Sequence, residues 1–220
     1  DLLTLRAAAI LRAVDVVCVP RSGAKSDSIA LQAAGAHIPA GTEIIDVPAP
    51  MTRDREKLEA EWHRGAERIA ARLAAGKSVA FITIGDAMLY STYAYFLRHV
   101  RALMPAVEVE SVPGVTSFAA AAAHLNLALA EGGEKFAVVP AVDDPAGLRP
   151  LLAACDSAVL MKPAARYEEI LAVLNNMGLK DKAIYVSRLG FPDQFITRDL
   201  DSRKKQHDYL SLILIKKGGL

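Results

Sequence analysis

Strand-like and helix-like patterns alternate along almost the whole chain, and this alternation constrains the fold more than any other feature. Short apolar runs such as residues 15–19 (DVVCV) and 78–84 (SVAFITI) are typical of buried parallel strands. Between such runs, apolar residues recur at helical spacing, as in residues 52–75, which end before Gly76. The sequence therefore predicts an α/β protein with mostly parallel sheets.

The pattern gives a bounded set of expected elements. We expect helices at residues 4–13, 26–34, 52–75, 91–102, 116–125, 147–153 and 167–176. We expect strands at residues 15–19, 42–47, 78–84, 107–112, 135–139, 157–162, 182–187 and 209–216. No helical pattern follows the last strand, so the second half should contain a mixed or antiparallel sheet.

The Pro113-Gly114 pair interrupts the alternation and predicts a domain boundary. We expect an N-terminal α/β domain at residues 1–112 and a C-terminal α/β domain at residues 113–220. Thr4 is placed to cap a helix that starts almost at once, without a preceding strand. We therefore expect the chain to begin inside a domain.

Charge and hydropathy argue against several classes of function. The chain has 26 Lys and Arg against 25 Asp and Glu, so no overall field favours nucleic acid or an anionic membrane. No apolar run approaches the roughly 20 residues that span a bilayer, and we expect a cytoplasmic protein. Cys18 and Cys155 lie outside any metal or redox pattern, so we expect buried thiols and no metal site. The highly charged residues 198–208 predict a solvated loop.

Two turns carry the residues best suited to bind a ligand. The first follows the apolar strand 78–84, where Gly85 allows close backbone approach and Asp86 can accept hydrogen bonds from ribose hydroxyls or an ammonium group. The second contains Pro113-Gly114, then Thr116 and Ser117 at a helix start. Ligands of open α/β sheets gather where strands end, so the two turns together predict a binding site.

This pair of turns resembles the signature of the tetrapyrrole (corrin/porphyrin) methylases. Within that family the chain is most similar to the precorrin-2 C20-methyltransferase branch, although Ala87 stands where the family usually has proline. The resemblance runs over essentially the whole chain and rests on residues 4–8 (TLRAA), 19–22 (VPRS), 85–92 (GDAMLYST), 113–118 (PGVTSF) and 160–162 (LMK).

The resemblance implies a class III methyltransferase architecture of two α/β domains, with the active site in the cleft between them. It also implies a homodimer, and a first strand and glycine-rich loop directly before Asp1. The expected reaction transfers a methyl group from S-adenosyl-L-methionine to C20 of precorrin-2 or cobalt-factor II in cobalamin biosynthesis, with S-adenosyl-L-homocysteine as product. The cofactor-binding residues that it implies are Ile84, Gly85, Asp86, Leu89, Thr116, Ser117, Ala141 and Met161.

The chemistry itself asks for positioning more than for covalent catalysis, because the reduced tetrapyrrole is a carbon nucleophile and the sulfonium is a good leaving group. Tyr90, His124 and Asp86 are weak candidates for the base that removes a proton. The carboxylates of a tetrapyrrole call for basic side chains, and Arg21, Lys25 and Arg188 are the candidate substrate ligands.

The sequence alone leaves other hypotheses about the function open. The chain could act on uroporphyrinogen III or on a later precorrin. It could be a diphthamide-type methylase, which modifies a protein, or a module that binds an adenosine ligand without catalysis. The sequence does not decide whether the substrate carries cobalt.

Overall fold

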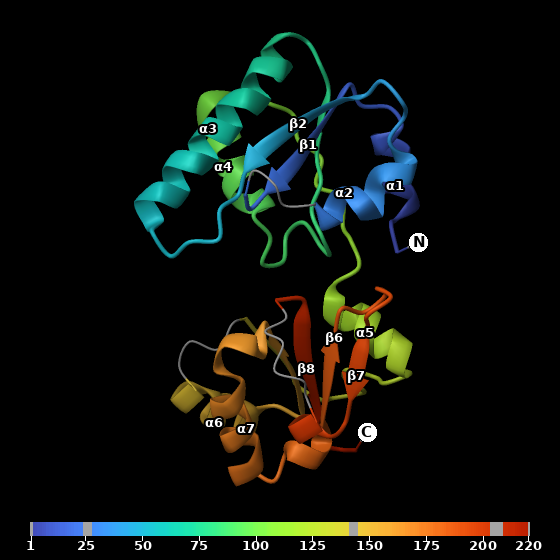
Figure 1. Ribbon diagram of the computed structural model, residues 1–220, viewed down its shortest axis with the longest axis vertical. Helices are drawn as coiled ribbons and strands as arrows, with labels where there is room; N and C mark the ends of the chain where they lie inside the picture. Colours follow the sequence, from blue (N-terminus) through green and yellow to red (C-terminus); the bar gives the residue numbers. More distant parts are fainter. Residues whose placement is uncertain (1, 24–27, 141–144, 203–208, 220) are drawn as a thin grey trace. The chain divides into compact units, whose positions relative to one another are not determined.

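The computed structural model describes residues 2–23, 28–140, 145–202 and 209–219 (Figure 1). The chain divides into two compact units, Asp1–Thr116 (unit 1) and Ser117–Leu220 (unit 2). The expected division lay at residue 113. No helix in the described part of the chain is long and apolar enough to cross a membrane.

Unit 1 contains a parallel three-stranded sheet with the strand order β2-β1-β3. Its strands are β1 (Val16–Arg21), β2 (Glu43–Pro48) and β3 (Val79–Phe81). Its helices are α1 (Leu5–Leu11), α2 (Ile29–Ala34), α3 (Arg55–Ala74) and α4 (Tyr93–Leu103), with a 3₁₀ turn at Gly35–His37.

Helices cover both faces of this sheet (Figure 1). On one face, Val16 and Cys18 of β1 pack with Trp62 of α3 and Phe96 of α4. On the other face, α1 and α2 pack over alternate strand residues, including Val17. Strands buried on both faces explain the continuous apolar runs in the sequence.

Local sequence signals set the ends of the helices in unit 1. Thr4 caps α1 as predicted, since its Oγ1 accepts a hydrogen bond from the Ala7 N–H at 3.2 Å. Asp54 caps α3 in the same way through Lys57, and Gly76 follows that helix with a φ of +76°. A Cβ atom on Gly65 would overlap with the Phe96 ring, so glycine lets α3 and α4 approach closely.

Unit 2 contains a mixed five-stranded sheet with the order β4-β5-β8-β6-β7. Its strands are β4 (Phe136–Val139), β5 (Ser157–Met161), β6 (Ala183–Ser187), β7 (Phe195–Thr197) and β8 (Ser211–Lys216). Its helices are α5 (Ser117–Leu125), α6 (Pro145–Ala154) and α7 (Tyr167–Asn176), with 3₁₀ turns at Pro163–Arg166, Lys180–Lys182 and Leu200–Ser202. The last strand, β8, pairs antiparallel with both β5 and β6, which confirms the expected mixed sheet.

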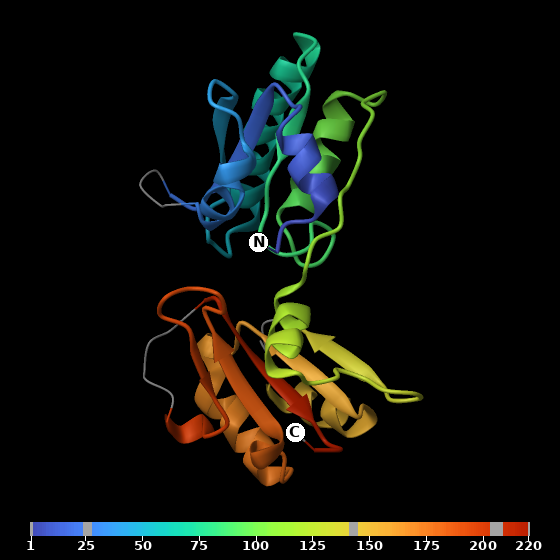
Figure 2. The same cartoon turned by 90° about the vertical axis from the view of Figure 1, so that its right-hand side faces the viewer.

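The sheet of unit 2 is also covered on both faces (Figures 1 and 2). Helices α6 and α7 pack on one face through residues such as Leu152 and Ile170, and α5 packs on the other through Ala121. All residues of β8 are buried, including Lys216, whose ammonium group contacts Glu134 and lies 3.8 Å from Glu131.

The structure differs from the expected elements at the following places. Residues 107–112 form no strand. Side-chain hydrogen bonds hold this segment instead of the backbone hydrogen bonds of a sheet, since Glu110 binds Arg6 and Ser111 binds the Tyr93 hydroxyl. Strand β3 ends at Phe81, short of the predicted end at residue 84. Strand β7 lies within a region where we expected no strand. The predicted solvated loop at residues 198–208 is partly wrong, because residues 200–202 form a 3₁₀ turn in which Leu200 packs into the core and its carbonyl accepts a hydrogen bond from Tyr167. Residues 203–208 fall outside the described residues.

Candidate active site

The first candidate region lies at the carboxyl edge of the sheet in unit 1. Because β1, β2 and β3 are parallel, the loops after Arg21, Pro48 and Phe81 leave the same edge. The loop after β3 carries residues 82–92, including the predicted Gly85-Asp86 turn. This is the edge at which open α/β sheets bind ligands.

The Asp86 carboxylate joins the two turns that the sequence singled out. Its Oδ1 accepts a hydrogen bond from the Met88 N–H at 2.8 Å, and its Oδ2 accepts one from the Gly114 N–H at 2.9 Å. Asp86 therefore does not start a helix; it fixes its own turn and attaches the second turn to it.

Glycine is required on both sides of this contact. Gly85 has a φ of +73°, a conformation that L side chains rarely adopt. A Cβ atom on Gly114 would overlap with the carbonyl oxygen of Gly85, so only glycine permits this approach. The predicted motif residues thus form one rigid junction within unit 1.

The rest of the loop is fixed by hydroxyl groups. Ser91 Oγ lies 2.9 Å from Thr83 Oγ1 and accepts a hydrogen bond from the Tyr93 N–H, at the first residue of α4. Tyr90 adopts a φ of 51°, which is uncommon for a residue with a side chain. The Ser91 hydroxyl thus connects the end of the loop to Thr83 on one side and to the start of α4 on the other.

Apolar side chains project beside this polar junction. Ile84, Met88 and Tyr90 are 52%, 59% and 49% exposed, whereas Leu89 is half-buried. Exposed apolar groups around a carboxylate and free backbone suit a ligand with both apolar and polar parts.

Arg21 ends β1 at the same edge, but it is not a free cation. Its Nε donates a hydrogen bond to Asp46 Oδ1 of β2 at 2.7 Å. Lys25, the neighbouring candidate, lies outside the described residues.

The second candidate region lies at one edge of the sheet in unit 2, where β4, β5 and β6 end. Met161, the last residue of β5, is half-buried and packs against the cluster around Ala121 and Val159. Ser117, the first residue of α5, is exposed. Ala141, predicted beyond β4, lies outside the described residues.

Arg188 follows β6 directly and is held in place by its neighbours. Its Nε lies 2.6 Å from Asp193 Oδ2, and its guanidinium group lies 4.8 Å from the centre of the Phe191 ring. The hydrogen bond from Arg188 holds the pKa of the Asp193 carboxyl below its usual range. Arg188 is thus held in one orientation, and Asp193 already neutralises part of its positive charge.

The surroundings of the three candidate bases do not single out one of them as the proton acceptor. Both oxygens of Asp86 already accept hydrogen bonds, and Tyr90 projects from its loop. His124 is exposed near the end of α5, with its Nε2 atom 3.4 Å from the Gln194 Nε2 atom. Across the described ranges, no group of three or more His, Cys, Asp or Glu side chains could hold a metal ion.

The structure thus groups the candidates within each unit. Within unit 1, it joins Gly85 and Asp86 to the turn that leads to Thr116, but Arg21 is committed to Asp46. The candidates in unit 1 are Arg21, Ile84, Gly85, Asp86, Leu89, Tyr90 and Thr116, and those described in unit 2 are Ser117, His124, Met161 and Arg188. The sequence did not indicate the bond between Asp86 and Gly114, because no local pattern links residues 28 positions apart.

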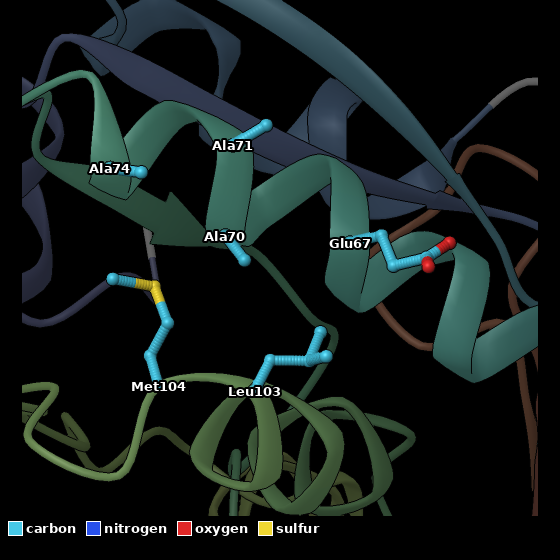
Figure 3. A pocket seen from close by; sticks show the side chains of 6 residues that line it. All are labelled: Glu67, Ala70, Ala71, Ala74, Leu103 and Met104. Atoms are coloured by element: carbon cyan, nitrogen blue, oxygen red, sulfur yellow. The ribbon is translucent and has the colours of Figure 1, made fainter.

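An apolar groove in unit 1 lies away from these residues (Figure 3). It has a volume of about 400 Å³ and runs between the C-terminal parts of α3 and α4, where Leu103 and Met104 face Ala70. The chain enters β3 just after α3, so this groove lies toward the amino edge of the sheet, opposite the loops after the strands. We do not assign the site to it.

Comparisons with known proteins agree with the family resemblance that the two turns suggest. The sequence model of the tetrapyrrole (corrin/porphyrin) methylases matches residues 1–201. The cobalt-precorrin-2 C(20)-methyltransferase of Salmonella typhimurium is 36% identical over 219 residues, which cover 99% of this chain and 91% of that protein. The precorrin-2 C(20)-methyltransferase of a Sinorhizobium species is 28% identical over 98% of this chain and 89% of its own length.

A solved structure shows the same fold. The uroporphyrin-III C-methyl transferase of Thermus thermophilus, complexed with S-adenyl homocysteine, superposes with a TM-score of 0.66 at 24% identity, over 98% of this chain and 91% of that one. The family-model match over residues 1–201 and the 36% identity to the Salmonella typhimurium protein establish that the chain belongs to the family of tetrapyrrole (corrin/porphyrin) methylases.

Proposed function

We propose that this protein transfers a methyl group from S-adenosylmethionine to C20 of precorrin-2 or its cobalt complex, in cobalamin biosynthesis. The observation that carries the proposal is the 36% identity to a cobalt-precorrin-2 C(20)-methyltransferase over 99% of this chain and 91% of that relative. The Asp86 junction adds support, because it joins the two turns on which the resemblance rests.

The residues at this junction fit an S-adenosyl ligand. Gly85 presents exposed backbone beside the apolar Ile84, and each Asp86 oxygen keeps a lone pair for a hydroxyl or ammonium group. The Thermus thermophilus relative of this fold is complexed with S-adenyl homocysteine, which supports the same ligand here. When bound, S-adenosylmethionine supplies an electrophilic methyl group on a sulfonium.

We assign the contacts of this ligand by position. Ile84, Gly85, Asp86 and Leu89 contact its methionine and ribose parts, and Thr116 and Ser117 contact its amino-acid end. Met161 contacts the adenosine part, and Ala141, outside the described residues, is a weaker candidate for the same role. These roles match the chemistry of the residues: Gly85 has exposed backbone, Thr116 and Ser117 carry hydroxyl groups, and Met161 has a half-buried thioether.

The tasks of the protein in the reaction are binding, orientation and removal of one proton. The reaction replaces the hydrogen on C20 by the methyl group of the sulfonium, so the residues of the protein would hold C20 in line with that methyl group and accept one proton before or after the transfer. Tyr90, His124 and Asp86 remain the candidate acceptors, and Arg21, Lys25 and Arg188 the candidate ligands of the substrate carboxylates. Orientation supplies most of the rate, because the two reactants need little activation.

The cobalt complex is the first substrate to test. The relative named for a cobalt-containing substrate is 36% identical to this chain, and the one named for precorrin-2 is 28% identical. A metal that arrives inside the substrate needs no ligand cluster on the protein.

Mass spectrometry of anaerobic reactions tests the proposal. Protein and S-adenosylmethionine are incubated with the cobalt complex or with precorrin-2, and Asp86→Asn serves as the impaired variant. A gain of one methyl group, located at C20 by NMR, supports the proposal and identifies the substrate. Parallel reactions with uroporphyrinogen III and calorimetry with S-adenosylhomocysteine complete the test. A gain on uroporphyrinogen III alone, or no gain on any substrate with S-adenosylhomocysteine still bound, overturns the proposal in favour of another methylase branch or a binding module.

We extend the proposal to assembly and location. Family resemblance supports a homodimer, which light scattering of the purified protein would test. Cys18 and Cys155 are free and buried, which suits the reducing cytoplasm. The near-neutral net charge of +1 favours a small-molecule partner over nucleic acid or a membrane.

A further inference from the structure

Two cationic residues bracket the start of β8 in unit 2. Lys162 directly follows β5 and Arg188 directly follows β6, and both strands pair with β8. The Lys162 N–H donates to the Ser211 carbonyl at 3.0 Å, and the Arg188 N–H donates to the Leu210 carbonyl at 2.9 Å. With one strand between them, their backbones lie two strand spacings apart, about 10 Å.

Both residues adopt a backbone conformation that favours glycine or asparagine. The φ of Lys162 is 53° and that of Arg188 is 50°. A residue with a long side chain is disfavoured here relative to glycine, so the backbone alone does not explain a lysine at this position. The explanation must come from what the side chain does.

The Lys162 ammonium group is oriented by an aromatic ring, and it forms no ion pair with the residues that the structure describes. It lies 4.8 Å from the centre of the Tyr209 ring, and Tyr209 is itself 52% exposed. No carboxylate in the described ranges forms an ion pair with Lys162, in contrast to Arg188, which pairs with Asp193. A ring on one side restricts the ammonium group and leaves its N–H donors available to an anion on the other side.

We propose that Lys162, oriented by Tyr209, binds a peripheral carboxylate of the tetrapyrrole substrate and so contributes to substrate specificity. This inference rests on the proposed function, because the acetate and propionate groups of a tetrapyrrole supply the anions. Lys162 directly follows Met161, the last residue of β5, so it lies at the edge of the sheet to which we assign the ligands. The carboxylate of S-adenosylmethionine is the competing anion, and the test separates the two.

Three variants separate the effect of the Lys162 charge from the effects of its backbone conformation and of the Tyr209 ring. Lys162→Asn removes the charge and keeps a residue that tolerates the left-handed conformation. Lys162→Arg keeps the charge, and Tyr209→Leu removes only the ring. Lys135→Asn is the matched control, because Lys135 is exposed and precedes β4, at the opposite edge of the same sheet.

Anaerobic initial rates give KM and kcat for the tetrapyrrole, and calorimetry gives the Kd of S-adenosylhomocysteine. We expect Lys162→Asn to raise KM about tenfold, the effect of one charge-assisted hydrogen bond, with kcat and the Kd nearly unchanged. Lys162→Arg should retain most of the affinity, Tyr209→Leu should raise KM about threefold, and Lys135→Asn should change nothing.

The outcomes separate this inference from the proposed function. If the parent protein methylates C20 and Lys162→Asn leaves KM unchanged, or weakens S-adenosylhomocysteine binding instead, the inference alone is overturned. If the parent protein methylates no tetrapyrrole, both are overturned. Thermal unfolding of each variant distinguishes a loss of substrate affinity from a loss of folded protein.

Discussion

The Oδ2 atom of Asp86 accepts a hydrogen bond from the Gly114 N–H at 2.9 Å, and this bond joins two turns that lie 28 residues apart in the chain. The other oxygen of Asp86 closes its own turn through Met88. A single carboxylate thus fixes the relative position of the two family motifs, and its neighbours Gly85 and Gly114 leave no room for a Cβ atom between them. The first two predictions test this junction.

Gly114→Ala should destabilise the protein and weaken ligand binding. The added Cβ atom overlaps with the Gly85 carbonyl, a backbone atom that cannot move aside without opening the junction. We expect a loss of about 2 kcal/mol in the free energy of unfolding, measured in urea, and a higher Kd for S-adenosylhomocysteine. Gly133→Ala is the control, because a Cβ atom there meets nothing within 4 Å. Equal stability of the two variants would contradict the close approach.

Asp86→Asn should weaken cofactor binding more than it weakens folding. An amide offers one acceptor oxygen where the carboxylate offers two, so one of the two hydrogen bonds is lost. We expect a loss of about 1 to 2 kcal/mol in stability and a Kd for S-adenosylhomocysteine raised about tenfold or more, measured by calorimetry. Asp54→Asn is the matched control, because Asn caps a helix as well as Asp does and should leave α3 intact. A normal Kd in Asp86→Asn would show that the carboxylate is dispensable.

The sequence predicted the elements whose cause is local. Strand 209–216 was identified from its apolar run, and all of β8 is indeed buried, with antiparallel neighbours on both sides. The cap at Thr4 was also predicted correctly, because a cap depends on residues within one turn.

The errors arose where a distant contact decides the structure. Residues 107–112 alternate Val and Glu as a strand does, yet Glu110 and Ser111 are held by side chains of Arg6 and Tyr93, far away in the sequence. At the candidate site, the residue types of both turns were recognised from the sequence. Their connection through Asp86 and the pairing of Arg21 with Asp46 depend on the fold, so no local pattern could predict them.

Both cysteines should resist thiol reagents in the folded protein. Burial raises the pKa of the Cys18 thiol to about 12 and also raises that of Cys155. The thiolate is the reactive form, so at pH 8 only about one Cys18 in ten thousand is reactive, and the reagent must also reach a buried strand. We expect labelling by a chromogenic disulfide to be slow in buffer and to reach both thiols in urea. Fast labelling of Cys18 in buffer would contradict its position in the core.

Stability should fall in acid, partly because Glu134 is paired with Lys216. The hydrogen bond from Lys216 holds the pKa of Glu134 below its ordinary value of 4.5. A carboxyl group with a lowered pKa in the folded state stabilises the fold above its unfolded pKa and loses that contribution as the pH falls through the folded pKa. Glu43 should act in the same direction, because hydrogen bonds from Lys77 and Arg72 lower its pKa.

Glu134→Gln isolates this contribution. At pH 7 the variant should be less stable than the parent, because the buried Lys216 then keeps, among the described residues, an ion pair with Glu131 alone, at 3.8 Å. As the pH falls through the lowered pKa of Glu134, the parent loses the charge on this carboxyl group, so the two stabilities should converge. Glu108→Gln is the control, since Glu108 is exposed and forms no ion pair within the described residues. Urea unfolding from pH 7 into the acid range measures the difference, and a gap between parent and variant that never narrows as the pH falls would show that ionisation of Glu134 does not stabilise the fold.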